Sequence, residues 1–203
     1  SKVESIWPLM ISAAIFCATM TMTPGPNNVL LATSGANFGI RRTLPHLIGI
    51  RVGQTLLHVS ILLGLGGVFE TWPVMHQALQ FASLAYLLFL AYKVFTLPVD
   101  NELAVAERQP MTVKESALFQ WINPKTWMAT ITLCTAFTIG GEAYWLSAIA
   151  GVFIFNIIGF PASFTWVILG ATIRRKLNTT KRRKVFNLLM SGLLLVTIPL
   201  IIR

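Results

Sequence analysis

Two prolines stand close together within the first long apolar stretch of the sequence, in the segment Met22-Thr23-Pro24-Gly25-Pro26-Asn27-Asn28. Proline has no N–H to donate, so Pro24 leaves the Met20 carbonyl without its usual helical partner. Pro26 does the same to the carbonyl of Met22. Free carbonyl oxygens inside an apolar segment can accept hydrogen bonds from a cationic group such as an ammonium. The segment therefore predicts a break in a helix and a place where a polar ligand can bind.

A new helix can begin directly after this break. Gly25 disfavours helix, and the residue before a proline is pushed toward extended backbone angles. The first amides of the new helix have no partner within it, which leaves those of Asn27, Asn28 and Val29 free. These amides lie at the positive end of the helix dipole, where they suit a carboxylate.

A second break is predicted in another apolar stretch, at Trp121-Ile122-Asn123-Pro124-Lys125. Pro124 frees the carbonyl of Gln120, and the Asn123 amide and the Lys125 cation lie beside it in the sequence. In lipid, unpaired backbone groups are tolerated only where they are buried in protein or line a cavity. Paired interruptions in two halves of a chain point to a transporter's substrate site. The alternative is a pair of simple proline kinks.

The composition is that of a membrane protein. Of the 203 residues, 55% are hydrophobic and only 11% are charged, whereas a soluble domain has roughly 25% charged residues. The net charge of +9 is compatible with nucleic-acid binding, but the basic residues stand between apolar runs and form no aromatic-interleaved surface. We therefore expect contact with membrane lipid and none with nucleic acid.

The apolar runs predict an all-α membrane protein with six transmembrane helices of ~20 residues or more. These spans are Ile6–Ala32, Leu44–Val68, Trp72–Phe95, Ser116–Ile139, Ala143–Thr172 and Lys184–Ile202. The first and fourth contain the breaks, and the fifth has a kink at Pro161. The chain then divides into a three-helix repeat at residues 1–96, a cytoplasmic linker at 97–115 and a second three-helix repeat at 116–203.

The two halves are predicted to form an inverted-topology repeat. Each half has an odd number of spans, so the second half must enter the membrane from the opposite side. Pro26 and Pro124 then occupy corresponding helices, the first of each half.

Basic residues mark the side of the membrane that each loop occupies. They gather between spans one and two, around the linker, and between spans five and six: Arg41, Arg42, Lys93, Arg108, Lys114, Arg174, Arg175, Lys176, Lys181, Arg182, Arg183 and Lys184. The opposite side has only Lys2 and Arg203. Cytoplasmic loops are rich in Lys and Arg, so we expect both termini to face outward.

Two cations lie inside predicted spans, whereas all 7 acidic residues lie at or outside span ends. Arg51 is about two turns into the second span, and Lys125 adjoins the second break. Each costs ~2.5–3.5 kcal/mol at a helix centre. Their possible partners are the freed carbonyls, Asn and Gln side chains, or an anionic group of a substrate. In the structural alternative, Lys125 snorkels to the headgroups and Arg51 caps broken-helix carbonyls.

Arg51, Gln54 and His58 occupy one stripe of the second span, at i, i+3 and i+7. Because no carboxylate lies in the spans, His58 is the candidate for carrying a proton near neutral pH. Its alternative role is a structural hydrogen bond to a neighbouring helix. Gly49 and Gly53 lie on a neighbouring face with the spacing that permits close helix packing.

The motifs Thr23-Pro24-Gly25-Pro26-Asn27 and Asn123-Pro124-Lys125, in a chain of 203 residues with six spans, resemble those of the LysE/RhtB family of bacterial amino-acid exporters. The resemblance covers essentially the whole chain. It implies efflux of amino acids or their derivatives across the bacterial cytoplasmic (inner) membrane, driven by the proton gradient. It marks as site residues Pro24, Gly25, Pro26, Asn27, Asn123, Pro124 and Lys125.

We therefore predict a carrier, not an enzyme, without cofactor or metal, whose site lies where the broken helices cross. The carboxylate of an amino acid would face the amides of Asn27–Val29, with Arg51 or Lys125 nearby, and its ammonium would face the freed carbonyls. A neutral amino acid needs no buried acid. One rival is a membrane thiol–disulfide electron carrier using Cys17 and Cys134, since carriers in the wider superfamily resemble this architecture. Another is a non-transporting membrane assembly factor.

Overall fold

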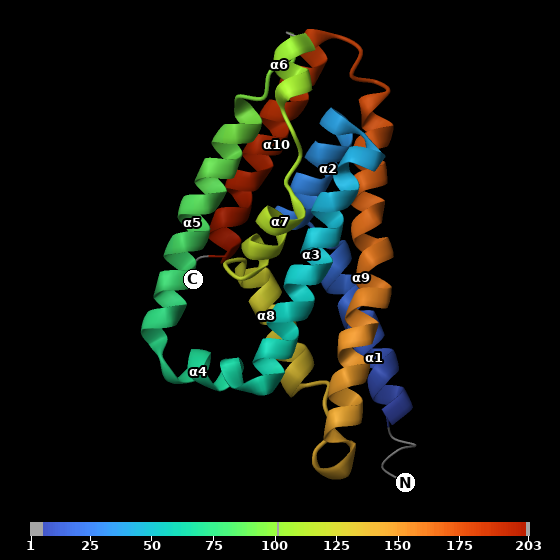
Figure 1. The fold of residues 1–203 in the computed structure, drawn as a ribbon, viewed down its shortest axis with the longest axis vertical. Helices are drawn as coiled ribbons and strands as arrows, with labels where there is room; N and C mark the ends of the chain where they lie inside the picture. Colours follow the sequence, from blue (N-terminus) through green and yellow to red (C-terminus); the bar gives the residue numbers. More distant parts are fainter. Residues whose placement is uncertain (1–5, 101, 202–203) are drawn as a thin grey trace.

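The computed structural model describes residues 6–100 and 102–201, and every regular element in this part of the chain is a helix. In order they are α1 (Ile6–Met22), α2 (Pro26–Phe38), α3 (Ile40–Ser60), η1 (Ile61–Leu65), α4 (Gly66–Thr71), α5 (Pro73–Phe95), α6 (Glu102–Glu107), α7 (Val113–Gln120), α8 (Pro124–Thr135), η2 (Gly141–Ala143), α9 (Tyr144–Arg174) and α10 (Thr180–Ile201). The prediction of an all-α chain is confirmed (Figure 1).

The first predicted break separates α1 from α2. Helix α1 ends at Met22, α2 begins at Pro26, and the two helices are bent by 56°. Gly25 is extended between them, with φ −175° and ψ 178°, so the helical hydrogen-bond ladder does not continue across it. The break is confirmed at the predicted residues.

The second predicted break separates α7 from α8. Three i→i+3 hydrogen bonds close the chain there: Trp121 N–H to Leu118 O (3.1 Å), Ile122 N–H to Phe119 O (3.1 Å) and Asn123 N–H to Gln120 O (3.3 Å). The Asn123 side chain caps α8 by accepting a hydrogen bond from the Lys125 amide at 3.1 Å. The break is confirmed, but the prediction of a free Gln120 carbonyl is wrong, because the tightened last turn satisfies it.

The second predicted span contains a break that we did not predict. Helix α3 passes into the π-helical turn η1 and then into α4, which leads toward α5 (Figure 1). Gly64 has a φ of 126° within this turn, a backbone region that favours glycine. The signal in the sequence is Gly64 with Gly66 and Gly67 close by.

Three helical stretches are long and apolar enough to cross a membrane: Ile40–Thr71, Pro73–Phe95 and Gly141–Arg174. The bent pair of α1 and α2 makes a fourth if it is one span. The pairs α1–α2 and α7–α8 run in opposite directions along the molecule (Figure 1), as an inverted repeat requires. Six spans in two inverted halves remain a prediction, and Ile202, the predicted end of the sixth, lies outside the described residues.

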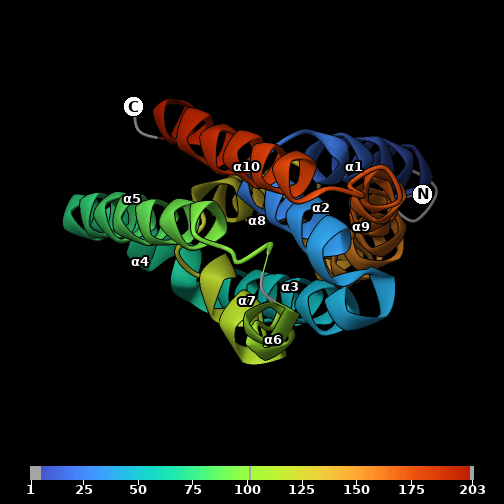
Figure 2. The ribbon, with the colours of Figure 1, turned by 90° about the horizontal axis from the view of Figure 1, so that it is seen from above.

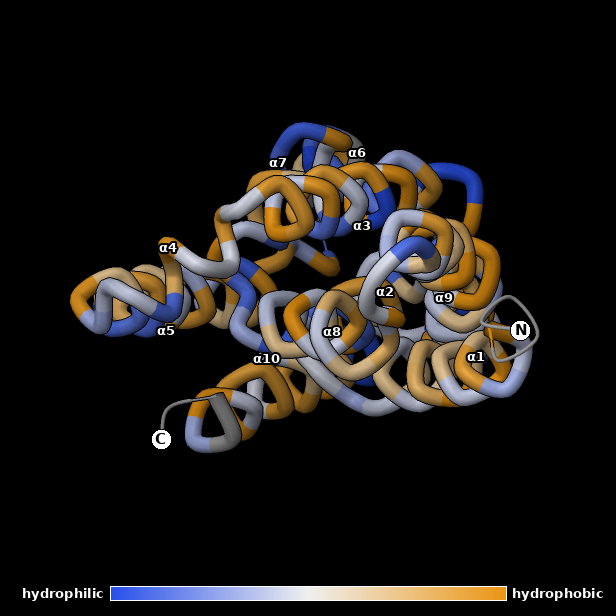
Figure 3. Tube along the Cα trace, turned by 90° about the horizontal axis from the view of Figure 1, so that it is seen from below, coloured by the Kyte–Doolittle hydropathy of each residue, from blue (hydrophilic) through white to orange (hydrophobic). Residues whose placement is uncertain are grey.

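The surface is apolar and part of the interior is polar, the reverse of a soluble protein. Among the exposed side chains, Trp7, Phe81 and Ile157 are exposed by 70%, 76% and 67%. Gln120 and Asn123 are buried, with 0% and 1% exposed. Hydrophobic residues predominate along the helices in Figure 3. This distribution suits a protein whose outer face meets lipid and whose polar groups meet one another.

The basic loops gather at one end of the molecule. Arg42 donates to the carbonyl of Arg108 at 2.9 Å, and Arg183 donates to that of Val99 at 3.4 Å. The connection between α9 and α10 therefore lies at the same end as α6 and the start of α3 (Figure 1). Helix α4 and the connection between α8 and α9 lie at the opposite end. Lys2 and Arg203 lie outside the described residues.

Small residues let the central helices approach closely. A Cβ on Gly53 would overlap the backbone of Ala117 in α7, and one on Gly49 would overlap Ser116. Gly170 of α9 meets the backbone of Ala32 in α2 in the same way. Close packing at Gly49 and Gly53 is therefore confirmed. Helix α2 lies among α3, α9 and α10 (Figure 2), which places the first break in the middle of the bundle.

Candidate functional site

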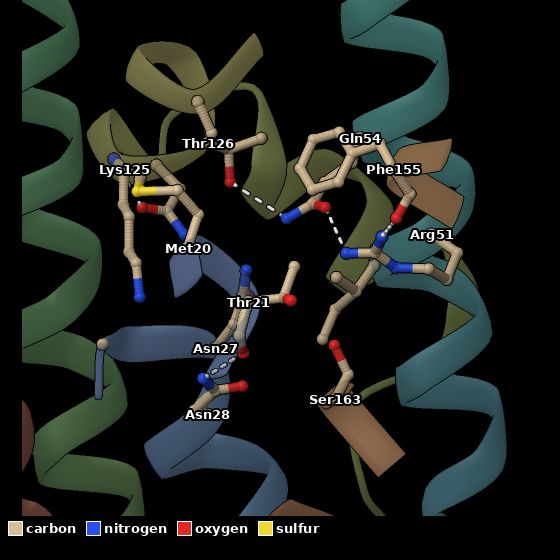
Figure 4. A pocket seen from close by; sticks show the side chains of 14 residues that line it. Met20, Thr21, Asn27, Asn28, Arg51, Gln54, Lys125, Thr126, Phe155 and Ser163 are labelled. Carbon is tan, nitrogen blue, oxygen red and sulfur yellow. Dashed lines mark hydrogen bonds between the residues drawn. The ribbon is translucent and has the colours of Figure 1, made fainter. Parts of the chain in front are cut away.

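A small polar cavity of about 30 Å³ lies where the two breaks meet (Figure 4). Its lining comes from α1, α2, α3, α8, α9 and both breaks: Met20, Thr21, Gly25, Asn27, Asn28, Ile50, Arg51, Gln54, Asn123, Lys125, Thr126, Ala129, Phe155 and Ser163. On the measure in which about 10–15 Å³ holds one water, the cavity has room for a few waters at most, and its polar groups bind mainly to one another.

Asn27 and Gln120 join the two breaks directly. Asn27 Nδ2 donates to Gln120 Oε1 at 2.8 Å, and Gln120 Nε2 donates back to Asn27 Oδ1 at 3.0 Å. The same Gln120 oxygen accepts hydrogen bonds from Thr126 Oγ1 at 2.9 Å and from Gln54 Nε2 at 3.3 Å. Gln120 thus links α2, α3 and α8 through hydrogen bonds, and it joins the first break to the second directly.

Arg51 lies on the opposite wall with only neutral partners. Its guanidinium donates to the backbone carbonyl of Phe155 at 3.0 Å and to Gln54 Oε1, and it stacks over the Phe155 ring at 5.1 Å. Within the described part of the chain, its Nε is buried without a hydrogen-bond partner. Gly159 provides the space, since a Cβ there would overlap the guanidinium. Among the described residues, Arg51 is therefore a buried cation with spare hydrogen-bonding capacity and no anionic hydrogen-bond partner.

The carbonyls at the first break have acquired partners. Asn28 Nδ2 donates to both Thr21 O and Thr23 O at 2.8 Å. Met22 O accepts a hydrogen bond from the indole N–H of Trp166 in α9 at 3.1 Å. Met20 O accepts a hydrogen bond from Thr23 Oγ1 at 3.1 Å, so the two carbonyls that the prolines release from the helix ladder are bonded to side chains, and the prediction that they are free is wrong.

Lys125 also reaches the first break. Its ammonium donates to Thr23 O at 2.8 Å, and its side chain lies against Gly25, where an added Cβ would be 3.0 Å from both Cδ and Nζ. This contact crosses from one half of the chain to the other. The sequence offered two roles for Lys125: pairing with a carbonyl at a break, or snorkelling to the headgroups. In the structure Lys125 pairs with a carbonyl at the first break.

One predicted backbone donor at this break is occupied. The amide of Val29 donates to Gly25 O at 3.0 Å, so the prediction that it is free is wrong. Its carbonyl partner belongs to the residue immediately before α2, which supplies the first turn with an acceptor.

The motifs and the geometry of the site agree with the comparisons of this chain with known protein families. The profile of the LysE type translocators matches residues 18–201. The chain belongs to this family.

Named relatives support the same assignment. The cysteine/O-acetylserine efflux protein of Shigella flexneri serotype 5b (strain 8401) is 27% identical over 174 residues, which cover 83% of this chain and 86% of the relative. The protein of the same name from Escherichia coli (strain K12) has the same identity and coverage. No solved structure matches the chain.

Most predicted site residues of this translocator lie around the central cavity. That group is Gly25, Asn27, Asn28, Arg51, Gln54, Asn123 and Lys125. The three prolines of the motifs, Pro24, Pro26 and Pro124, line a larger neighbouring cavity instead. His58 is absent from both linings. It is buried edge-on to the Phe155 ring at 6.1 Å, and its Nδ1 has no hydrogen-bond partner among the described residues.

The sequence did not single out the residues that complete the site. They are the side chains of Gln120, Thr126 and Ser163 and the backbone carbonyl of Phe155. Gln120 carried a signal, because an amide residue directly before a predicted break in an apolar span needs a buried partner. Phe155 acts through its backbone carbonyl, for which its residue type gives no signal.

The two cysteines of the translocator belong to different hydrophobic clusters and form no disulfide. Cys17 packs in a cluster with Ala129 and Leu133, whereas Cys134 packs beside Trp127 in another cluster. Both are free thiols. This placement gives no support to the electron-carrier hypothesis.

Proposed function

We propose that this translocator exports neutral amino acids or their derivatives across the bacterial cytoplasmic membrane, as a six-helix carrier built from two inverted repeats. One observation carries the proposal: Arg51, a buried cation with no anionic hydrogen-bond partner among the described residues, faces the polar network that joins the two breaks. The names of the relatives, cysteine/O-acetylserine efflux proteins, support a substrate of this class.

The carboxylate of the substrate binds Arg51 in this proposal. Arginine presents a planar fork of N–H groups that matches a carboxylate, and charge-assisted hydrogen bonds are about twice as strong as neutral ones. The present acceptors of Arg51 are a side-chain amide and a carbonyl. A carboxylate can therefore displace Gln54 with a net gain and also use the unpartnered Nε.

The ammonium of the substrate binds the carbonyls of the first break. Thr21 O and Thr23 O now accept hydrogen bonds from Asn28 and Lys125. An ammonium offers three donors, so it can replace these side chains without leaving a carbonyl unpaired. A zwitterion then satisfies both ends of the site, and no buried acid is required. A dibasic amino acid would bring a second cation without a partner.

Binding must open the network, because a cavity of about 30 Å³ does not hold an amino acid. The contacts that the substrate exchanges join the two halves of the chain: Asn27 with Gln120, and Lys125 with Thr23. Substrate binding thereby couples to the movement of one half against the other, which is the basis of alternating access in repeat-built transporters. We assign proton coupling to His58, the buried titratable ring nearest Arg51's partner Phe155.

Counterflow in proteoliposomes tests the function. Vesicles loaded with O-acetylserine, cysteine, leucine, threonine or lysine are offered a labelled amino acid at equal pH. We expect exchange with one or more neutral amino acids and none with lysine. The double variant Cys17→Ala/Cys134→Ala should exchange at the wild-type rate. Loss of all activity in that variant would favour an electron carrier, and exchange with no amino acid would overturn the proposal.

Orientation is tested by labelling from outside. We propose that the end formed by α6 and the α9–α10 connection faces the cytoplasm, following the basic residues gathered there. In the cysteine-free protein, a single cysteine at Glu142 should react with an impermeant thiol reagent on intact cells. One at Asn178 should react only after lysis. The reverse pattern would contradict this orientation.

A further inference from the structure

A second cavity, of about 480 Å³, adjoins the central one on the side of α5. It is lined by residues of the first break and of α2, α4, α5, α8 and α10: Pro24, Gly25, Pro26, Phe69, His76, Leu79, Gln80, Pro124, Lys125, Met128, Ile131, Thr132 and Thr197. Its volume falls within the ~300–1,000 Å³ of small-molecule sites. Gly25 and Lys125 line both cavities.

The walls of this cavity combine apolar and polar surface. Leu79, Met128 and Ile131 supply much of the apolar part. His76 and Gln80 lie four residues apart in α5, so they share one face of that helix. Polar side chains in a membrane helix are costly unless they face protein or a water-filled cavity. A cavity wall that carries both polar and apolar side chains therefore suits a ligand with polar and apolar parts better than it suits a lipid acyl chain.

Lys125 forms the partition between the two cavities. Its side chain lies across Gly25, whose missing Cβ leaves the space it occupies. Its ammonium bonds to Thr23 O, which is uncharged. Lys125 thus brings positive charge to the wall of the large cavity, on the path from the central one.

We propose that the large cavity is a second substrate compartment, in which the carboxylate of an amino acid pairs with Lys125 while its side chain packs on Leu79, Met128 and Ile131. The inference rests on the proposed function and extends it: the carboxylate passes from Arg51 in the central cavity to Lys125 in the next. Phe69 and His76 flank the connection from α4 to α5, at the end opposite the basic loops (Figure 1). With the orientation proposed above, this compartment lies on the export side.

Substrate protection of a single cysteine tests this compartment. Leu79→Cys is introduced into the Cys17→Ala/Cys134→Ala protein in proteoliposomes, and its reaction with a small maleimide is followed with increasing O-acetylserine or leucine. We expect saturable slowing of at least threefold. Glu142→Cys, on an exposed connection, is the matched control and should react at the same rate throughout.

Two cation variants then separate the compartments. Lys125→Met should abolish protection of Leu79→Cys, whereas Lys125→Arg should keep most of it and Arg51→Met should leave it in place. Gly25→Ala should weaken protection by displacing the Lys125 side chain without removing its charge. Unchanged elution on size exclusion and an unchanged Glu142→Cys rate show that the variants are folded.

The outcomes that overturn the inference are distinct from those that overturn the function. Counterflow is measured on the same vesicles. If exchange proceeds but Leu79→Cys is never protected, the cavity is not a substrate compartment. If protection is equal with Lys125→Met, Lys125 does not bind the carboxylate. Either result overturns the inference, and the proposed function stands. If no amino acid exchanges, both fall.

Discussion

The two breaks differ in how their backbone groups are satisfied. Around the first, carbonyls from Thr21 to Thr23 accept hydrogen bonds from Asn28 in the next helix, Trp166 in α9 and Lys125 in α8. Around the second, the chain closes on itself with i→i+3 bonds and the cap of Asn123. The first break has two donors from distant parts of the chain, Trp166 and Lys125, whereas the described donors of the second break lie close to it in sequence.

This difference indicates which break exchanges its hydrogen bonds when a substrate binds. Side chains that hold the first break can leave its carbonyls when a ligand offers equivalent donors, because no helical hydrogen bond must be broken. At the second break, the side-chain donor is the Trp127 indole N–H, which bonds to Trp121 O at 2.7 Å and belongs to the helix that directly follows the turn. We infer that the α1–α2 break changes its contacts during transport while the α7–α8 turn serves as a fixed support.

The largest effect is expected for Arg51→Met, which removes the cation facing both breaks. Hydrogen bonds to charged groups are worth about 1.5–3 kcal/mol, equivalent to roughly tenfold to more than a hundredfold in affinity. Binding of O-acetylserine, measured by calorimetry on purified protein, should fall by about a hundredfold. Arg51→Lys should retain part of the affinity. Wild-type binding by Arg51→Met would show that the cation is only structural.

A single methyl group in α9 should produce a similar but smaller loss. The Cβ of Gly159→Ala would overlap the Arg51 guanidinium, whereas that of Gly151→Ala has nothing within 4 Å. Alanine favours helix over glycine by about 1 kcal/mol, so neither variant should fail to fold. We expect roughly tenfold weaker binding for Gly159→Ala alone, in line with a displaced hydrogen-bonding group. Equal affinities of the two variants would contradict this role of Gly159.

Thermal unfolding in detergent compares the two breaks directly. Asn28→Leu leaves Thr21 O of the first break without its donor and Thr23 O with Lys125 alone, at about 1–3 kcal/mol for a buried group left unpaired. Asn123→Ala removes one helix cap, worth about 1 kcal/mol. The Tm should therefore fall further for Asn28→Leu. If Asn123→Ala is the more damaging variant, the second break is not the self-sufficient one.

The smallest effect on exchange is expected for His58→Gln, because His58 belongs to neither break. Glutamine retains polarity but cannot carry the proton. Exchange at equal pH should persist, while export driven by a pH gradient should be lost. His46→Gln is the control, since His46 is also a buried histidine but lines neither the central cavity nor the large one. Gradient-driven export at the wild-type rate in His58→Gln would assign coupling to another group.

Much of the fold could be predicted because its signals are local. Proline removes a backbone donor wherever it stands, so both breaks were placed correctly at Pro24–Pro26 and Pro124. Gly49 and Gly53 of α3 indicated close packing, because the absence of a side chain is also a local property of the sequence. The turn at Gly64 was missed, since glycines in an apolar run are also compatible with a continuous helix.

The sequence by itself determined that this chain enters a membrane, where its helices break and which polar residues must find partners. In lipid no water can satisfy those groups, so their burial and pairing follow from residue type alone. Only the tertiary structure decided the pairs: Asn27 with Gln120, Arg51 with the Phe155 carbonyl, and Lys125 with the first break. Residues so distant along the chain become partners only when the helices pack against one another, and the sequence of a single segment does not determine that packing.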